Sequence, residues 1–588
     1  MNRVEFNLLN QAYNALIGRA RITKDINLNI AVKDRKTYKQ LQKKGLLATN
    51  GALTQVGLEA LQPFKVDNAV ILAAGSASRF IPLSLEQPKA LYEVKGERLI
   101  ERQIQQLLDA GIDDITIVLG YKKEMFQYLK DKYPVKFVFN PSYNIKNNIE
   151  SIYLCKDILQ NTYICVCDSY FSENPFNAYE YDSFYAGYST THKEDEMFAI
   201  CDSKYHITDM QKGLDRGYVL LGHSFWRASF AKKFIELAEV DHDIGRYDNM
   251  FWEWLVKDNL KVLPPFYFKE YEKDMIHEFD YFEQLREFDR HYLEYSHSEI
   301  IRNIKLVFRC DEEDIVDFRP VSEGMTNTSF IFKINGTDYI YRHPGDGTEN
   351  IINRRNEKHS LLLAKKFGID PTYIYMDVNE GWKISKFIHH FREPDYRNFM
   401  DSKKIIAVMR RLHGVPVKTD YGMKPWEDSL SMEQLLRSAD EHCFDQYKTL
   451  KDKIARLYQK TQSDGVQKCF CHGDTYKPNW MIKDDGSVIL IDWEYSGYSD
   501  PGIDVGYYIV DAMYDFDEAK RFIAEYLGDA FTPEREFHFM AYTAIIAYYW
   551  FVWALYRESC GADMGKALQN WHDMAVKYAD FLLMGKSD

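Results

Sequence analysis

Residues 68–79 read NAVILAAGSASR, and residues 88–91 read PKAL. The apolar run at the start predicts a buried strand that ends in a turn of small residues. Such a turn lets backbone N–H groups approach a triphosphate, and Arg79 and Lys89 would neutralise charge as it develops on the phosphate. The spacing fits neither the P-loop nor the dinucleotide-binding fingerprint. The stretch predicts a nucleotidyl-transfer site with Lys89 and Arg79 as its catalytic residues.

Outward from this stretch, strands and helices alternate. A helix is predicted over 99–110, and further strands over 114–120, 135–140 and 163–168. This order predicts a Rossmann-like domain over 66–300, with a mostly parallel sheet and helices on both faces. Asp168 ends the last of these strands, at the edge where an α/β sheet presents its ligands.

Four further motifs, Gly120-Tyr121, Asn140–Tyr143, Asn147–Ser151 and Asp168–Tyr170, complete a resemblance. The segment resembles the sugar-nucleotide pyrophosphorylase-like nucleotidyltransferases, and among them the bacterial CTP:phosphocholine cytidylyltransferases. The resemblance implies transfer of a cytidylyl group from CTP to phosphocholine. It also implies a Mg²⁺ ion on Asp168. Ser169 stands where the family often has a second acidic residue, so Asp280 is expected to complete the site, in preference to Glu278.

The same resemblance assigns binding residues. The nucleotide is expected to contact Leu72, Ala73, Ala74, Gly75, Asn147, Asn148 and Ser151. Phosphocholine would need aromatic and acidic groups around a quaternary ammonium. The candidates are Tyr170, Tyr218, Trp226, Asp248, Trp252 and Trp254, with core packing as the alternative for each. Tyr170 and Asp248 are kept for this role.

A second chemical cluster lies near the C-terminus, where residues 471–479 read CHGDTYKPN and residues 491–494 read IDWE. A strand pair between these motifs would bring Asp474, Asn479 and Asp492 into one cleft. Asp474 is placed to orient a substrate hydroxyl. Asn479 and Asp492 are placed to hold Mg²⁺ against the phosphates of ATP.

These motifs resemble the aminoglycoside phosphotransferase and choline kinase superfamily over residues 301–588. The resemblance implies a two-lobed, protein-kinase-like α+β domain, with an N-lobe over about 301–388 and a C-lobe over about 389–588. Residues 322–327 would cover the ATP phosphates. Arg342 replaces the usual lysine, with Glu357 as its ion-pair partner. The adenine is expected at Ser385, Phe387 and Ile388, and Asp504 is expected to support the catalytic loop.

The substrate clue is WFVW at residues 550–553. The i, i+3 spacing places Trp550 and Trp553 on one helix face, where two indoles can enclose a trimethylammonium group. Choline kinases have a similar pair. Two core tryptophans remain the alternative. Glu494 and Tyr495 could add a charge and a ring.

Residues 1–65 differ from the rest in charge, with 11 Lys and Arg against 4 Asp and Glu in a chain of net charge −14. Helices are predicted over 7–18 and 34–44, followed by a hairpin over 45–57. The order resembles a winged helix-turn-helix. DNA binding and a protein-contact appendage both remain open.

Nine cysteines without a C-x-x-C pair indicate reduced thiols in a cytoplasmic enzyme. The uncharged run over 539–556 predicts a buried helix, not membrane insertion.

The two resemblances imply a bifunctional enzyme that phosphorylates choline with ATP and converts the product to CDP-choline. The alternatives are the same chemistry on ethanolamine, another amino alcohol or a sugar phosphate, and a nucleotide-sensing DNA-binding regulator. Oligomeric state and transfer of phosphocholine between sites are left open.

Overall fold

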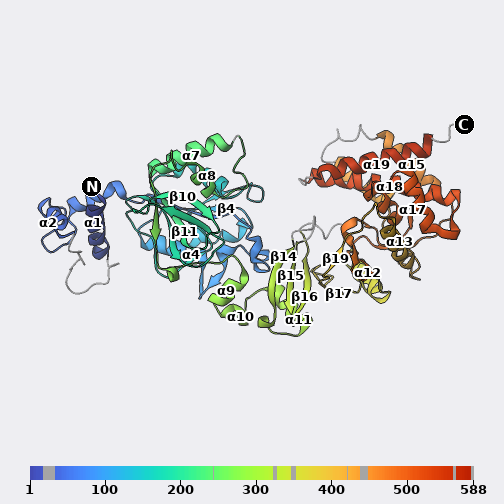
Figure 1. Ribbon diagram of the computed structural model, residues 1–588, viewed down its shortest axis with the longest axis horizontal. Helices are drawn as coiled ribbons and strands as arrows, with labels where there is room; N and C mark the ends of the chain where they lie inside the picture. The colour runs from blue at the N-terminus through green and yellow to red at the C-terminus, as the bar shows by residue number, and fades with distance from the viewer. Residues whose placement is uncertain are drawn as a thin grey trace. The chain divides into compact units, whose positions relative to one another are not determined.

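The computed structural model describes residues 1–17, 34–242, 244–321, 328–345, 353–419, 421–437, 448–560 and 564–584 (Figure 1). The chain divides into two compact units, Met1–Pro320 and Val321–Asp588. The predicted limits after residues 65 and 300 both fall within the first unit, and they stay predictions.

The N-terminal segment is helical, with α1 (Arg3–Leu16), α2 (Arg35–Lys43) and α3 (Gln55–Leu61). The predicted hairpin over 45–57 is wrong beyond a single antiparallel bridge between Leu47 and Leu53. Its second strand is replaced by α3, because the Thr54 hydroxyl accepts a hydrogen bond from the Gly57 N–H at 3.0 Å and caps the helix. A winged-helix fold therefore stays a prediction.

A nine-stranded sheet forms the centre of the first unit. Its core, in the order β6-β1-β4-β5, is parallel, as the alternation predicted. The strand β11 then pairs antiparallel with β6 and extends the sheet through β8 and β9. The sheet strands are β1 (Asn68–Ala73), β4 (Ile115–Leu119), β5 (Val135–Phe139), β6 (Thr162–Val166), β8 (Ser183–Thr190), β9 (Met197–Cys201), β10 (Ile207–Lys212), β11 (Gly217–Trp226) and β12 (Phe266–Glu270).

Both faces of this sheet are buried. Alternate residues of β1 point to opposite sides of the sheet, and each set packs in a separate core cluster. Ile71 packs in one core cluster with Ile104 of α4 (Leu99–Asp109). Val70 packs in the other with residues of α7 (Ala228–His242) and α8 (Trp252–Asn259). The remaining elements of this unit are β2 (Glu93–Val94), β3 (Glu97–Arg98), α5 (Leu129–Lys132), α6 (Asn148–Tyr153), β7 (Ser169–Phe171), β13 (Ile276–Glu278), α9 (Phe282–Phe288), α10 (His291–Glu294) and α11 (Glu299–Phe308), with β14 (Val316–Val321) crossing the division.

The second unit opens with antiparallel strands in the order β15-β16-β18-β17. Asn335-Gly336 forms the turn of a hairpin: β15 and β16 pair on either side of it, and both turn residues have positive φ, 50° and 75°. The elements of this lobe are β15 (Thr328–Ile334), β16 (Thr337–His343), α12 (Arg354–Lys366), β17 (Tyr373–Met376) and β18 (Lys383–Lys386).

Helices dominate the rest of the second unit. The longest, α18 (Pro533–Ser559), is long and apolar enough to cross a membrane, but 89% of its most apolar stretch is buried in the structure. It packs in one core with its neighbouring helices, as expected for a buried helix. The other elements are β19 (Phe391–Arg392), α13 (Phe399–His413), α14 (Pro425–Arg437), α15 (Lys448–Thr461), β20 (Cys469–Cys471), β21 (Trp480–Lys483), β22 (Val488–Leu490), β23 (Gly497–Ser499), α16 (Gly502–Asp511), α17 (Phe516–Leu527) and α19 (Gly565–Met584).

Candidate active sites

The first site is centred on an ion pair between Lys89 and Asp168. Asp168 follows the end of β6, and its Oδ2 lies 2.9 Å from Lys89 Nζ. The lysine is only 7% exposed. Burial acts to lower the pKa of Lys89, but Asp168 and Glu278 act more strongly together and raise the pKa above its ordinary value. The lysine is therefore held charged in a buried position.

A second carboxylate, Glu278, lies beside this pair. The strands β7 and β13 pair so that Glu278 stands opposite Ser169, next to Asp168. Burial, and then the charge of Asp168, raises the pKa of Glu278 well above its ordinary value. Asp168 Oδ1 is buried and has no hydrogen-bond partner among the described residues. Two crowded carboxylates with a free buried oxygen fit a divalent cation.

Asp280, the expected second ligand, is half-buried two residues further on, and its charge acts on the pKa of Lys89. Its role stays a prediction. The structure also makes Glu278 a strong candidate. The sequence offered both carboxylates in IHEFD, but not the strand pairing that sets Glu278 against Ser169.

The small-residue turn leaves the carboxyl end of β1. Leu72, Ala73 and Ala74 are buried, whereas Gly75 and Arg79 are exposed. Gly120, after β4, lets this turn lie close, because a Cβ there would be 2.6 Å from the Ala74 carbonyl oxygen. The turn is thus fixed at its start and open beyond Gly75, in the place expected for a nucleotide.

The three polar residues assigned to the nucleotide also carry structural bonds. Asn147 Oδ1 accepts from the Asn148 N–H at 2.7 Å at the start of α6, and Asn148 Oδ1 accepts from the Trp252 N–H at 2.9 Å. Ser151 Oγ accepts from Asn140 Nδ2 at 3.0 Å. These bonds fix the side chains, and nucleotide contact by each of them stays a prediction.

The phosphocholine candidates lie in different settings. The Tyr170 ring has the Arg102 guanidinium 4.5 Å from its centroid, so a cation of the chain itself already lies over the ring. The Asp248 carboxylate lies 3.1 Å from Lys146 Nζ. Trp226 and Trp252 are 0% and 2% exposed and pack in the core. The roles of Tyr170 and Asp248 stay predictions.

The second site contains a network of buried charges. Arg342 Nη2 lies 2.5 Å from Glu357 Oε1, which confirms the expected ion pair. Arg342 Nη1 lies 3.1 Å from Asp492 and 3.0 Å from Glu494. Burial, and then the nearby Asp492, raises the pKa of Glu494 to about 7.

Lys383 belongs to the same network, although no local motif in the sequence marks it. Its Nζ lies 3.0 Å from Glu357 Oε1 and 3.3 Å from Asp492 Oδ1. It stands directly opposite Arg342 in the β16–β18 pairing. Two cations therefore share one buried glutamate and one aspartate.

The catalytic-loop motif forms a compact cluster. Asn479 Nδ2 donates to Asp474 Oδ2 at 3.0 Å, and the β21–β22 pair predicted between the motifs is present. Burial, and then the charge of Asp492, raises the pKa of Asp474 well above its ordinary value. Asp474, Asn479 and Asp492 are thus brought together as predicted, and their oxygens suit Mg²⁺.

Asp504 supports the catalytic loop through hydrogen bonds to its backbone. Its carboxylate accepts from the N–H groups of His472 and Gly473 at 2.8 and 2.7 Å, which confirms its expected supporting role. Gly473 has a φ of +86°, and a Cβ there would lie 2.5 Å from the Tyr495 carbonyl oxygen. Only glycine fits this position, so the motif places Asp474 through its backbone as well as its side chains.

The residues expected to contact adenine lie in the last part of β18 and just after it. Ser385 lies in that strand, opposite Ile340. Phe387 follows it, with its N–H donating to the Asp338 carbonyl at 3.0 Å, and Ile388 is half-buried. Their contact with adenine stays a prediction. The loop predicted over 322–327 lies outside the described residues.

Aromatic side chains surround Trp550. Its ring centroid lies 5.3 Å from Trp553, 5.6 Å from Tyr495 and 5.0 Å from Tyr507. Trp571 of α19 lies 5.9 Å away. Trp550 and Trp553 are 4% and 5% exposed. The structure therefore brings the two tryptophans and Tyr495 together and adds Tyr507 and Trp571, which the sequence reading missed because they come from other helices.

This aromatic cluster adjoins the catalytic loop. Burial, and then the charge of Asp474, raises the pKa of Tyr507 well above its ordinary value. Trp550 Nε1 is buried without a hydrogen-bond partner among the described residues. The aromatic rings around Trp550 and the carboxylate of Asp474 therefore lie in one region of the second unit.

Two family models match the chain. Residues 318–544 match the choline/ethanolamine kinase family, and residues 69–191 match the MobA-like NTP transferase domain. The second range includes Lys89 and Asp168, and the first includes Asp474 and Asp492.

Characterised relatives match the same regions. The choline-phosphate cytidylyltransferase of Streptococcus pneumoniae is 38% identical over 224 residues, which is 38% of this chain and 96% of the relative. The 2-aminoethylphosphonate cytidylyltransferase of Lancefieldella rimae is 36% identical over 234 residues, 38% of this chain and 93% of the relative. Protein LicA of Haemophilus influenzae is 21% identical over 269 residues, 44% of this chain and all of the relative.

Two solved structures are also similar to parts of this chain. The CTP:phosphocholine cytidylyltransferase LicC from Streptococcus pneumoniae is 37% identical, with a TM-score of 0.37, and covers 38% of this chain and 97% of its own. The choline kinase LicA from the same organism is 25% identical, with a TM-score of 0.43, and covers 48% of this chain and 99% of its own.

Proposed function

The chain belongs, through its middle third, to the choline-phosphate cytidylyltransferase family and carries a choline/ethanolamine kinase domain after it, and from this premise we propose that it makes CDP-choline in two steps. The kinase domain transfers the γ-phosphoryl group of ATP to the hydroxyl of choline. The nucleotidyltransferase domain transfers the cytidylyl group of CTP to phosphocholine and releases pyrophosphate.

One observation carries this proposal: both domains stand in one chain. Phosphocholine is the product of the first reaction and the acceptor in the second. A shared intermediate gives a chemical reason for the fusion, and each assignment therefore supports the other.

In the cytidylyl transfer, the phosphate of phosphocholine attacks the α-phosphorus of CTP, and no protein nucleophile is needed. Lys89, held charged by Asp168, would face the charge that develops on the α-phosphate, and Arg79 would neutralise the outgoing pyrophosphate. Asp168 would hold Mg²⁺ with Glu278 or Asp280. Bound there, the ion would withdraw charge from the phosphate oxygens.

In the kinase reaction, Asp474 would accept or orient the proton of the substrate hydroxyl, with Asn479 fixing its carboxylate. Asn479 and Asp492 would hold Mg²⁺, which would neutralise charge on the ATP phosphates. Arg342 and Lys383 bring two further positive charges to the same place. Glu357 keeps both oriented.

Choline recognition is assigned to the aromatic cluster, with Trp550, Trp553 and Tyr495 enclosing the trimethylammonium group and Glu494 adding negative charge. A cation–π contact in a desolvated site contributes up to about 2 kcal/mol. Replacing one ring of the cluster should therefore weaken choline binding by about tenfold.

The test is incubation with choline, ATP, CTP and Mg²⁺, with phosphocholine and CDP-choline followed by mass spectrometry. Both products are expected. Activity on ethanolamine without any on choline would overturn the substrate assignment, and a strong preference for another nucleotide in the second step would overturn the CTP assignment.

A paired substitution tests the aromatic cluster. Trp550→Leu keeps an apolar side chain but removes the ring, whereas Trp550→Phe keeps a ring. The KM for choline should rise about tenfold in the leucine variant and less in the phenylalanine variant, while the KM for ATP stays near its wild-type value. Equal KM values for choline in all three proteins would contradict the assignment.

The second candidate is the same chemistry on an amino alcohol or aminophosphonate without the methyl groups. The 36% identity to a 2-aminoethylphosphonate cytidylyltransferase favours it, as does a kinase family that includes ethanolamine kinases. Competition between choline and ethanolamine in one reaction decides between the two.

We place the enzyme in the cytoplasm, in keeping with the free cysteines among the described residues.

A further inference from the structure

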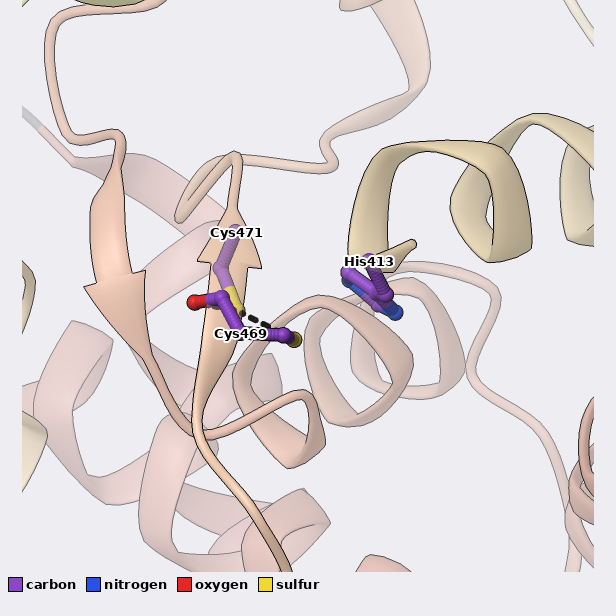
Figure 2. Close-up of side chains that lie close together, drawn as sticks. All are labelled: His413, Cys469 and Cys471. Carbon is purple, nitrogen blue, oxygen red and sulfur yellow. Dashed lines mark hydrogen bonds between the residues drawn. The ribbon is translucent and has the colours of Figure 1, made fainter. Parts of the chain in front are cut away.

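Behind the catalytic loop of the kinase domain, two cysteines and one histidine lie together (Figure 2). Cys469 and Cys471 are two residues apart in β20, so both thiols lie on one side of the strand. His413 is the last residue of α13. One possible ligand atom from each residue lies within 4.8 Å of the other two.

We propose that Cys469, Cys471 and His413 form a binding site for a thiophilic divalent cation such as Zn²⁺, separate from the magnesium sites. Zinc binds thiolate at about 2.3 Å, so two thiolates on one tetrahedral ion lie about 3.7 Å apart. The two Sγ atoms here are 3.6 Å apart. The sulfur pair therefore already has the required separation.

The histidine is oriented as a metal-binding histidine commonly is. Its Nε2 lies 2.9 Å from the Asp504 carboxylate and its Nδ1 lies 2.7 Å from the Tyr526 hydroxyl. Because a carboxylate only accepts, Nε2 donates to Asp504, and in the neutral imidazole Nδ1 is then left to accept from Tyr526 or to bind a metal in its place. A carboxylate behind the histidine is the usual outer partner of a zinc ligand.

The surroundings also favour a cation. Cys471 Sγ lies 3.5 and 3.4 Å from the carbonyl oxygens of Ser499 and Asp500. The hydrogen bond between the two sulfurs lowers the pKa of the Cys469 thiol, whereas burial raises the pKa of the Cys471 thiol well above its ordinary value. Binding would form two metal–sulfur bonds and one metal–nitrogen bond, break two S–H bonds, and release both protons to solvent.

The chain offers a matched comparison. Cys165 and Cys167 have the same C-x-C spacing at the end of β6. No histidine joins them in a metal-type cluster among the described residues. Spacing alone therefore does not define the proposed site, and Cys165→Ser is the control.

The experiment titrates the reduced full-length protein with Co²⁺ as an optical substitute for Zn²⁺. Oxygen ligands at the magnesium sites give no sulfur-to-cobalt charge-transfer absorption, so this band reports thiolate binding alone. One equivalent should produce the band. Cys469→Ser and Cys471→Ser should each abolish it, whereas Cys165→Ser and Cys560→Ser, which alters an exposed thiol, should retain it.

A second measurement on the wild-type protein avoids dependence on variants that fail to fold. One equivalent of Zn²⁺ should slow alkylation of Cys469 and Cys471, counted by peptide mass spectrometry, and leave that of Cys560 unchanged. Absence of the band, its persistence in the Cys469→Ser and Cys471→Ser double variant, or equal alkylation with and without Zn²⁺ would overturn the proposal.

Discussion

Lys383 contacts both Glu357 and Asp492 and so links the strand lobe to the proposed magnesium ligand. Lys383→Met removes one of two cations at this point and leaves Arg342 to balance both carboxylates. We expect kcat for choline phosphorylation to fall on the order of 100-fold, as for loss of one preorganised electrostatic group. Steady-state kinetics with ATP and choline measure this.

Lys386 provides the matched control, since it lies in the same strand but is exposed. Lys386→Met should keep near wild-type kinase activity, and both variants should convert phosphocholine to CDP-choline at the wild-type rate. A Lys383→Met enzyme with unchanged kcat would show that Arg342 alone suffices.

Glu253 predicts a pH dependence of stability in the first unit. It lies half-buried in α8, and its carboxylate accepts a hydrogen bond from the Tyr185 hydroxyl at 2.7 Å. Burial raises its pKa to about 7. The folded state therefore binds a proton more tightly than the unfolded state, so this contribution to stability is present below the ordinary pKa and lost as pH rises through 7.

Glu253→Gln removes this loss and keeps the shape of the side chain. Relative to wild type, the variant should gain roughly 2 kcal/mol of unfolding free energy between pH 5 and pH 8. Urea unfolding of both proteins at the two pH values measures the difference. An identical pH dependence in the two proteins would mean that Glu253 does not titrate in this range.

The residues that sequence reading could predict are those fixed by local motifs. Asp474 and Asn479 share one loop, and Asp168 ends a strand, so their placement follows from short stretches of chain. Lys383 and Trp571 depend on which strand pairs with β16 and which helix packs on α18. No short motif encodes that pairing, so those residues emerged only from the fold.

At the scale of elements, the end of β4 controls the nucleotide turn. Gly120→Ala would place a Cβ 2.6 Å from the Ala74 carbonyl oxygen and from Tyr143 Cβ. We expect a loss of about 1–3 kcal/mol in the stability of the first unit, because backbone must shift to relieve the contact. Thermal unfolding measures it, together with a fall in cytidylyl transfer.

Gly75 is the opposite case in the same turn. A Cβ there meets nothing within 4 Å. Gly75→Ala should leave thermal unfolding unchanged but raise the KM for CTP, because the added methyl group would occupy space expected for the nucleotide. Unfolding that shifts equally in the two glycine variants would contradict this separation of fold from binding.

The sequence predicted the elements that have a clear apolar pattern. It failed after Asn50-Gly51, where a turn signal is followed closely by a helix N-cap. The strand at 68–73 and the helix at 99–109 appear where the apolar pattern placed them. Asn50-Gly51 suggested a hairpin, but only one bridge forms. Thr54 then starts a helix that buries Leu61, which stabilises the segment more than an isolated two-stranded hairpin would.

At the scale of the whole molecule, the N-terminal helices are not an independent appendage in their packing. Leu9, Leu41 and Leu61 form one core cluster with Ala178 and Tyr179 of the nucleotidyltransferase region. A DNA or protein partner for residues 1–65 stays a prediction. The basic charge of that segment could be counted from the sequence. Its packing against Tyr179 could not be predicted, because Tyr179 lies far along the chain.

Each proposed site is built from residues of a single unit: Lys89 and Asp168 in the first, Asp474 and Asp492 in the second. Inactivating one site should therefore spare the other. Asp474→Asn should stop phosphorylation of choline yet still convert supplied phosphocholine to CDP-choline. Asp168→Asn should accumulate phosphocholine from choline and ATP and make no CDP-choline.

Mixing these two variants completes the test. Neither protein alone should make CDP-choline from choline, ATP and CTP, but the mixture should, because phosphocholine released by the Asp168→Asn protein can reach the intact site of the Asp474→Asn protein. Time courses by mass spectrometry should show phosphocholine rising before CDP-choline. Loss of both activities in either variant would mean that the two sites depend on each other, and a mixture that makes phosphocholine but no CDP-choline would mean that the intermediate cannot enter from solution.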